Sequence, residues 1–354
     1  MTEQTVSRAG PGSGRGGAPS AIALSPILSA RYRARDLERI RAAAPDARLV
    51  MVSVEGLADG PLDDVEVMLR GWLSSDAFDR ILVRAPRLSW VHSATSGVER
   101  ALTPSALERG IVVTNARGVF SRPIAEYVLM MILAVSRRLP QLLELQRERT
   151  WQPLEGAELR DVTVGIVGLG SIGRAVGTLA TAFGCRVVAV RRRTEPGSAS
   201  GSPDDAEPPL GELRLDRVGG PETLPELLAE SDFIVLAAPL TPETEEMINA
   251  QTLSLVKPGA WLINVARGRL IDERALLRAL RDGTIGGAVL DTFRDEPLPP
   301  MSSFYDLPNV IVTPHTAWSS GRVLDRSVEL FCDNLRRFAT GEPLLNVVDP
   351  SAGY

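Results

Sequence analysis

Residues 162–173 read Val-Thr-Val-Gly-Ile-Val-Gly-Leu-Gly-Ser-Ile-Gly, and this stretch decides the fold. Its first half is an apolar run of the length typical of a buried parallel strand. The strand leads directly into Gly168, Gly170 and Gly173, which open a helix with an apolar face. This order of strand, Gly-x-Gly-x-x-Gly turn and helix predicts a βα unit that binds the pyrophosphate of a dinucleotide at the helix N-terminus. The alternative is a glycine turn in an α/β domain that binds no ligand.

Each of the three glycines has a separate task in this prediction. Gly168 permits the tight turn after the strand, and Gly170 lacks a Cβ where the pyrophosphate must approach. Gly173 lets the helix pack closely on the strand.

The end of the next predicted strand, 186–190, indicates which dinucleotide binds. The strand continues into Arg191, Arg192 and Arg193, where an NAD-specific site carries Asp or Glu for the ribose 2′-hydroxyl. Guanidinium groups suit a 2′-phosphate instead, so we expect NADP to be favoured over NAD. Only Lys257 among the 39 basic residues is a lysine. The alternative is therefore that Arg192 and Arg193 are solvated loop residues of an arginine-rich chain.

Length and composition limit the classes of protein. A chain of 354 residues with 44% hydrophobic residues is expected to form about two globular domains. The net charge of −5 gives no electrostatic argument for nucleic-acid or membrane partners. The apolar run 127–135 is far shorter than the roughly 20 residues that cross a bilayer. Two cysteines cannot build a disulfide framework, so we expect a cytoplasmic protein.

Short apolar runs alternate with amphipathic stretches, which predicts two series of βα units. Residues 1–20 are rich in Gly, Ser and Pro, and a disordered tail is expected there. A first series of units begins at Ala21, and a second begins at Val162. The segment 194–220, rich in Gly, Ser, Pro and Asp, is expected to be a mobile insertion in the second series. Strands of the second series are expected at 162–167, 186–190, 233–238, 260–265, 286–290 and 309–313.

Three further helices are predicted from their apolar faces and their ends. Residues 123–138 form a long helix, with Pro123 in its first turn. This helix links the domains, lies in a dimer interface or packs in a core. A helix that opens with Asp272 closes before Gly283, and residues 323–338 form the last helix.

The last third of the chain carries an ordered trio, Arg267, Glu296 and His315. Reduction of a 2-keto acid requires that its carboxylate is held, its carbonyl polarised and the new alkoxide protonated. A guanidinium can bind both kinds of oxygen, and an imidazole can donate a proton near neutral pH. A neighbouring carboxylate orients the imidazole and favours its charged form. We therefore predict that Glu296 and His315 form a proton-donating pair; the alternative is a structural histidine and an exposed glutamate.

Four other residues follow predicted strands or lie within them. Asp291 ends a strand, where it could accept a hydrogen bond from the nicotinamide carboxamide. Pro239 and Thr244 follow another strand and are expected beside the adenosine. The second histidine, His92, has no evident partner, and we interpret it as structural. No metal site is expected.

On these residues, the chain resembles the D-isomer-specific 2-hydroxyacid dehydrogenases from about residue 45 to 345. The resemblance implies two Rossmann- and flavodoxin-like α/β domains with doubly wound parallel sheets. A cofactor domain, 123–316, is inserted within a substrate domain made of 21–122 and 317–354. The resemblance also implies a homodimer built through the cofactor domains. It rests on the segments 168–173, 239–244, 264–268, 290–293, 296–299 and 314–315.

The resemblance also implies roles for single residues. Arg267 resembles the substrate-binding arginine of the family, while Glu296 and His315 resemble its acid pair. Ser96 and Gly97 resemble the loop whose amides hold the substrate carboxylate. Further cofactor-binding residues are expected at Ser171, Ile172, Val265 and Asp291, and further substrate-binding residues at Arg70, Trp72 and Trp318.

Three functions fit these observations. The first is an NADPH-linked reductase of small 2-keto acids, of the glyoxylate or hydroxypyruvate type. The second is a 3-phosphoglycerate dehydrogenase, whose substrate phosphate needs extra cations; no C-terminal regulatory domain follows residue 345, which weakens this alternative. The third is a dinucleotide-sensing binding protein like the corepressors that share this fold, although the acidic chain argues mildly against DNA contact.

Overall fold

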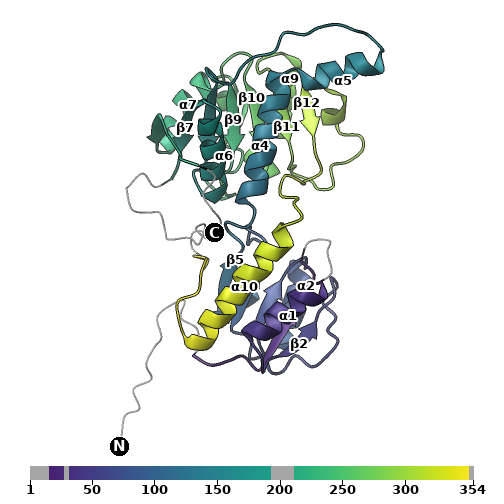
Figure 1. The fold of residues 1–354 in the computed structure, drawn as a ribbon, viewed down its shortest axis with the longest axis vertical. Helices are drawn as coiled ribbons and strands as arrows, with labels where there is room; N and C mark the ends of the chain where they lie inside the picture. Colours follow the sequence, from purple (N-terminus) through teal and green to yellow (C-terminus); the bar gives the residue numbers. More distant parts are fainter. Residues whose placement is uncertain (1–15, 28–31, 193–210, 351–354) are drawn as a thin grey trace, which may run out of the picture. The chain divides into compact units, whose positions relative to one another are not determined.

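The computed structural model describes residues 16–27, 32–192 and 211–350, and these form two compact units (Figure 1). Unit 1 combines Met1–Val119 with Gly321–Tyr354, and unit 2 is Phe120–Ser320. Unit 2 is thus inserted into the sequence of unit 1. Most of the predicted tail, 1–20, lies outside the described residues.

Unit 1 contains a five-stranded parallel sheet in the order β2-β1-β3-β4-β5. The strands are β1 Ala21–Leu24, β2 Arg48–Met51, β3 Val65–Arg70, β4 Trp90–Ser93 and β5 Val112–Asn115. The helices are α1 Ala34–Ala43, α2 Ser75–Arg84, α3 Pro104–Glu108 and α10 Val323–Thr340.

Helix α10, from the end of the chain, completes the core of unit 1. Its Phe331 and Phe338 lie 5.6 Å and 5.4 Å from Trp90 of β4, measured between ring centroids. Beyond the helix, Val347 forms a β-bridge with Thr114 of β5. Large buried aromatic rings contribute more than any other side chains to such a core.

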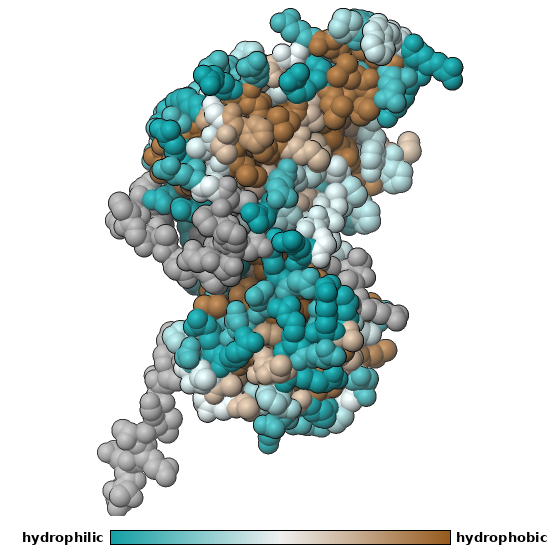
Figure 2. All heavy atoms as spheres, in the orientation of Figure 1, coloured by the Kyte–Doolittle hydropathy of each residue, from teal (hydrophilic) through white to brown (hydrophobic). Residues whose placement is uncertain are grey.

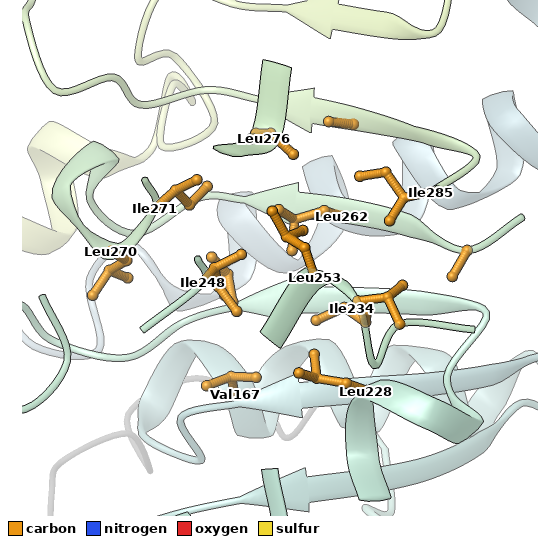
Figure 3. Packing of buried hydrophobic residues seen from close by; sticks show 14 of the residues in the cluster. Val167, Leu228, Ile234, Ile248, Leu253, Leu262, Leu270, Ile271, Leu276 and Ile285 are labelled. Carbon is orange, nitrogen blue, oxygen red and sulfur yellow. The ribbon is translucent and has the colours of Figure 1, made fainter. Parts of the chain in front are cut away.

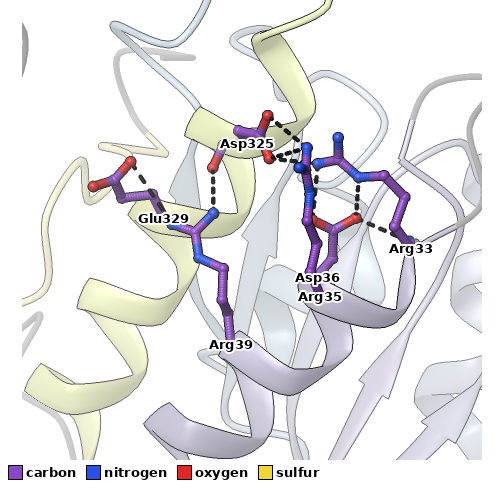
Figure 4. Close-up of polar contacts among 6 residues, drawn as sticks. All are labelled: Arg33, Arg35, Asp36, Arg39, Asp325 and Glu329. Atoms are coloured by element: carbon purple, nitrogen blue, oxygen red, sulfur yellow. Dashed lines mark hydrogen bonds and ion pairs between the residues drawn. The ribbon is translucent and has the colours of Figure 1, made fainter.

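Ion pairs also connect α10 to α1 (Figure 4). Asp325 accepts hydrogen bonds from Arg33 and Arg35, and Glu329 lies 3.8 Å from Arg39. All five side chains are at least one-third exposed, and surface pairs of this kind contribute about 0–1 kcal/mol each. Apolar packing rather than these charges therefore holds α10 in place.

Unit 2 contains a seven-stranded sheet in the order β12-β11-β10-β9-β6-β7-β8, and every neighbouring pair is parallel. The prediction of two doubly wound parallel-sheet domains is therefore confirmed. The strands are β6 Thr163–Val167, β7 Arg186–Val190, β8 Arg217–Gly219, β9 Phe233–Leu236, β10 Trp261–Asn264, β11 Gly287–Leu290 and β12 Val310–Val312. The helices are α4 Ser121–Ser136, α5 Leu139–Arg147, α6 Ser171–Ala182, α7 Leu224–Glu230, α8 Ala250–Leu253 and α9 Glu273–Arg281, with short 3-10 turns η2 Pro221–Thr223, η3 Gly268–Leu270 and η4 Ser303–Asp306.

The core of unit 2 is formed by the apolar runs that predicted its strands (Figure 3). Ile234 of β9 and Leu262 of β10 pack with Leu276 of α9 in one buried cluster. Helix α9 begins as predicted, because the Asp272 carboxylate caps it by accepting hydrogen bonds from the amides of Arg274 and Ala275.

Two elements differ from the predictions. Helix α5 was not predicted, and the structure buries none of its residues. Strand β8 lies within the segment 194–220 expected to be an insertion, but it pairs with β7 and extends the sheet. It is too short and polar to give an apolar signal, and the part of that segment before residue 211 lies outside the described residues. Among the described helices, none has the length and apolarity to cross a bilayer.

Candidate active site

The expected cofactor-binding and catalytic residues of unit 2 lie at one edge of its sheet. Gly168 follows β6, Arg267 follows β10, Asp291 directly follows β11, and His315 comes shortly after β12. Carboxyl ends of parallel strands meet at one edge, and ligands bind there where the strand order reverses. In unit 2 this point lies between β6 and β9, beside the glycine turn.

The three glycines of the turn differ in their surroundings: two are packed against backbone, and the third faces open space. Gly168 has a φ of +102°, and a Cβ there would lie 2.6 Å from the amide nitrogen of Ala238. A Cβ on Gly173 would lie 2.0 Å from the Gly168 carbonyl oxygen, so the protein's own backbone requires both glycines. Nothing lies within 4 Å of a Cβ on Gly170, the N-cap of α6. The amides of Ser171 and Ile172 begin this helix, and the arrangement fits a dinucleotide phosphate.

The arginines expected at the ribose follow β7. The Arg191 amide donates to the carbonyl of Gly219 in β8, and the Arg191 side chain is half-buried while that of Arg192 is exposed. The pKa of Glu243 is lowered by a hydrogen bond from Thr241 and, to a lesser extent, by the positive charge of Arg192. Arg192 therefore lies near a carboxylate, whereas Arg193 falls outside the described residues.

The side-chain hydroxyl of Thr244 stabilises the turn 239–244 after β9. The Thr244 hydroxyl donates to the Pro239 carbonyl at 2.7 Å and accepts from the Thr241 amide at 2.8 Å. Thr244 thus has a structural role in the turn, and its contact with adenosine stays a prediction. Val265, the residue after β10, is buried.

The predicted trio comes together around Glu296. Nδ1 of His315 lies 2.8 Å from Oε2 of Glu296, while Oε1 accepts a hydrogen bond from the Phe293 amide at 3.0 Å. An ionised carboxylate only accepts, so Nδ1 carries the proton and Nε2 is left for chemistry. The His315 side chain is 42% exposed, as a group that meets a substrate must be.

The pKa of Glu296 shows how the trio is coupled. Burial raises this pKa, but the hydrogen bonds from His315 and Phe293 and the positive charges of His315 and Arg267 lower it below its usual range. Arg267 is therefore close enough to act electrostatically on Glu296. Glu296 therefore stays charged and accepts the hydrogen bond from Nδ1 of His315.

The loop that carries Arg267 has a fixed conformation. Asn264 donates from Nδ2 to the Arg267 carbonyl at 2.9 Å and accepts from the Ala266 amide at 3.0 Å. A Cβ on Gly268 would lie 1.9 Å from the carbonyl carbon of Phe293. The Arg267 loop and the Glu296 loop are thus in direct backbone contact, which brings the two side chains together.

Asp291 is buried, with 1% exposure, and accepts three hydrogen bonds. Oδ1 accepts from the Thr313 hydroxyl at 2.6 Å and the Thr316 amide at 2.8 Å, and Oδ2 accepts from the Ala317 amide at 2.9 Å. A carboxylate has about four acceptor positions. One position on Oδ2 is left for the predicted nicotinamide contact. Trp318 donates from Nε1 to the His315 carbonyl at 2.7 Å.

The substrate-binding residues expected in unit 1 lie at the end of β3 or in the loops after β3 and β4. Arg70 is buried and donates to the carbonyls of Leu73 and Arg100, so its guanidinium orders two loops, while Trp72 is 52% exposed. The Ser96 carbonyl accepts from Asn115 Nδ2, and the Gly97 carbonyl accepts from the Thr95 hydroxyl. These bonds fix the peptide planes of the loop whose amides are expected to hold a carboxylate.

His92 is fully buried in the core of unit 1. Its Nδ1 pairs with the Thr114 hydroxyl at 2.8 Å. Burial lowers the pKa of His92 to about 3, so the imidazole is neutral in the folded protein.

Sequence reasoning missed the residues that hold the site. Asn264 contacts the Arg267 loop, Thr313 contacts Asp291, and Tyr127 contacts Thr313. A hydroxyl or amide next to a strand has no distinctive spacing in the sequence. Within the described ranges, no group of three or more His, Cys, Asp or Glu side chains could hold a metal ion.

Comparisons with known proteins identify the family of this chain. The family model for the NAD-binding domain of D-isomer specific 2-hydroxyacid dehydrogenases matches residues 129–317. A glyoxylate reductase of Thermococcus kodakarensis is 35% identical over 291 residues, which cover 79% of this chain and 81% of the relative.

Two solved structures extend the comparison. A D-isomer specific 2-hydroxyacid dehydrogenase from Xanthobacter autotrophicus Py2, in complex with NADPH and MES, has a TM-score of 0.78 and 30% identity, covering 95% of this chain and 100% of that one. An NADPH-dependent glyoxylate/hydroxypyruvate reductase from Sinorhizobium meliloti, in complex with NADP and sulfate, has a TM-score of 0.77 and 27% identity, with the same coverage.

Fold, site and relatives together define an NAD(P)-dependent oxidoreductase that acts on the CH–OH group of its donors. More specifically, the chain belongs to the D-isomer specific 2-hydroxyacid dehydrogenase family. The resemblance inferred from the sequence is thereby confirmed.

The coupling of Glu296 to His315 can be tested by titration. We expect the pKa of the Glu296 carboxyl group to lie below the ordinary range for glutamate. His315→Gln removes the imidazole's charge and its hydrogen bond while partial burial remains, so the pKa of Glu296 should rise. Carbon-13 NMR of labelled glutamate measures both values. Arg269→Gln is the control, because Arg269 pairs with Glu245, and it should leave the Glu296 titration unchanged. Equal titration midpoints of Glu296 in the wild type and in His315→Gln would contradict the coupling.

Proposed function

We propose that the protein reduces the C2 carbonyl of a small 2-keto acid, of the glyoxylate or hydroxypyruvate type, with NADPH favoured over NADH. The observation that carries this proposal is the Glu296–His315 pair beside Arg267, at the sheet edge that also holds the glycine turn. The glyoxylate reductase relatives and the NADP-bound neighbours support the substrate class and the cofactor.

The chemistry follows from the residues of the trio. Arg267 binds the carboxylate and polarises the carbonyl of the 2-keto acid through its guanidinium. A dinucleotide held at the glycine turn would supply the hydride. His315 donates the Nε2 proton to the resulting alkoxide, so the carbonyl becomes a hydroxyl group, and Glu296 stabilises the imidazolium before transfer. Asp291 is proposed to bind the nicotinamide amide. Arg70, Trp72, Ser96, Gly97 and Trp318 are proposed as substrate-binding residues.

The first test is a steady-state assay at 340 nm. It crosses NADPH and NADH with glyoxylate, hydroxypyruvate, pyruvate and phosphohydroxypyruvate. Turnover of the small keto acids with NADPH supports the proposal, whereas selective turnover of phosphohydroxypyruvate favours a 3-phosphoglycerate dehydrogenase. Cofactor binding without turnover of any substrate favours a dinucleotide sensor.

His315→Gln should lower kcat by roughly 100-fold or more, the scale of general acid catalysis. Because the His315 side chain is 42% exposed, the variant should fold normally. Fluorescence titration with NADPH checks that its cofactor site is intact. Near-normal turnover would remove His315 from the mechanism.

Arg191→Asp should lower the ratio of kcat/KM for NADPH to that for NADH. Loss of a hydrogen bond to a charged group costs about 1.5–3 kcal/mol, so we expect about a 10- to 100-fold change. Arg160→Asp is the matched control, because Arg160 is exposed and precedes β6 at the opposite edge of the sheet. An equal ratio in Arg191→Asp and wild type would show that Arg191 does not read the 2′-phosphate.

We also propose a homodimer formed through unit 2. Helix α5 exposes Leu139, Leu142 and Leu143, and Met130 of α4 is half exposed. Figure 2 shows apolar surface on the face of unit 2 that carries these helices. Clustered exposed apolar side chains of this kind mark interaction surfaces.

Leu142→Arg should convert the proposed dimer into a monomer, because it buries a charge in the apolar interface. Light scattering after size-exclusion chromatography measures the mass. Val83→Arg is the control, since Val83 of α2 is an equally apolar and more exposed residue of unit 1. A wild-type monomer at micromolar concentration would contradict the dimer.

A cytoplasmic location belongs to the same proposal. Cys185 and Cys332 are both buried and unpaired, and burial raises the pKa of each thiol to about 11. Both side chains therefore persist as neutral thiols, as a reducing compartment permits.

A further inference from the structure

The proposed proton donor sits in an unusual backbone conformation. His315 has a φ of +50°, in the left-handed region that non-glycine residues rarely adopt. Such a residue is retained only where its surroundings determine the conformation. The groups that hold His315 therefore decide where its imidazole points.

Residues before and after His315 in the sequence donate hydrogen bonds to the same buried carboxylate, that of Asp291. The amides of Thr316 and Ala317 donate to the two oxygens of Asp291, and the Thr313 hydroxyl donates to Oδ1. Thr313 and Thr316 flank the Pro314–His315 pair in the sequence. The carboxylate thus clamps the loop before and after the left-handed residue.

The hydroxyl of Thr313 extends this clamp to helix α4. Its oxygen lies 2.6 Å from the Tyr127 hydroxyl oxygen. Thr313 has a single hydroxyl proton, which it donates to Asp291, so Tyr127 must be the donor to Thr313. Burial raises the pKa of Tyr127 to about 12, so this donor keeps its proton. The hydrogen bonds therefore run in one direction, from Tyr127 through Thr313 to Asp291.

We propose that Thr313 and Tyr127 are positioning residues for the hydride-transfer reaction. They hold Asp291 in the orientation that fixes the left-handed turn and aims the His315 imidazole. This inference rests on the proposed function of His315 as the proton donor. Neither side chain needs to touch the substrate or the cofactor.

The matched pair Thr313→Val and Thr313→Ser tests the proposal. Valine keeps the shape of threonine without its hydroxyl, and serine keeps the hydroxyl. Misplacement of a reacting group by about 1 Å can cost about 100-fold, so we expect kcat to fall about 10- to 100-fold in Thr313→Val. KM for NADPH and for the keto acid should change less than kcat, and Thr313→Ser should restore most of kcat. Tyr127→Phe keeps the buried ring and should also lower kcat, by a smaller factor than Thr313→Val.

A second measurement does not depend on turnover. The chain has only two histidines, so their imidazole nitrogen-15 signals can be assigned by His315→Gln. Thr313→Val and Tyr127→Phe should shift or broaden the His315 signals and leave those of His92, in the other unit, unchanged. If the wild type turns over no keto acid, the proposed function fails, while this spectrum still tests the positioning of His315.

Three results would overturn the positioning role. The first is a Thr313→Val variant with the kcat and the His315 signals of the wild type. The second is an equal loss of kcat in Thr313→Val and Thr313→Ser. The third is a loss of kcat in Thr313→Val that disappears when this variant and the wild type are each assayed at the same interval below their own Tm. If Thr313→Val does not fold, Tyr127→Phe decides the question by the same readouts.

Discussion

Parallel pairing of all seven strands in unit 2 is the constraint on which the site depends. Because each strand points the same way, every loop that leaves a strand opens at one edge of the sheet. Gly168, Arg267, Asp291 and His315 come from four different strands, far apart in the sequence, and this geometry alone gathers them. An antiparallel strand in their place would send its loop to the opposite edge.

Within that edge, opposing electrostatic effects set the state of Glu296. Burial alone would favour a neutral carboxyl group at this position. The hydrogen bonds and positive charges around it outweigh burial, and the carboxylate remains ionised. The backbone contact between Gly268 and Phe293 places one of those charges, on Arg267, near the acid.

The sequence was sufficient for the fold class and for the elements with a strong periodic or capping signal. The βα unit at Gly168 and the helix capped by Asp272 follow from local chemistry that hardly depends on distant residues. Helix α5 was missed although its leucines recur at helical spacing, and none of them is buried. Strand β8 was missed because a short polar edge strand has no apolar pattern. The trio could be chosen by residue type, but the partners of Asp291 arise from tertiary contacts between β11, the His315 loop and α4. No spacing along the chain encodes such contacts.

Unit 1 is assembled from both ends of the chain, with the rings of Phe331 and Phe338 packed against Trp90. Domains generally fold as units while the chain is synthesised from its N-terminus. All of unit 2 leaves the ribosome before α10. Unit 1 therefore cannot complete its fold until unit 2 has been synthesised. Until α10 arrives, the apolar face of the first sheet is open to solvent. A nascent or truncated chain that stops before residue 323 would therefore expose this core to chaperones and proteases, although its dinucleotide domain could already be complete.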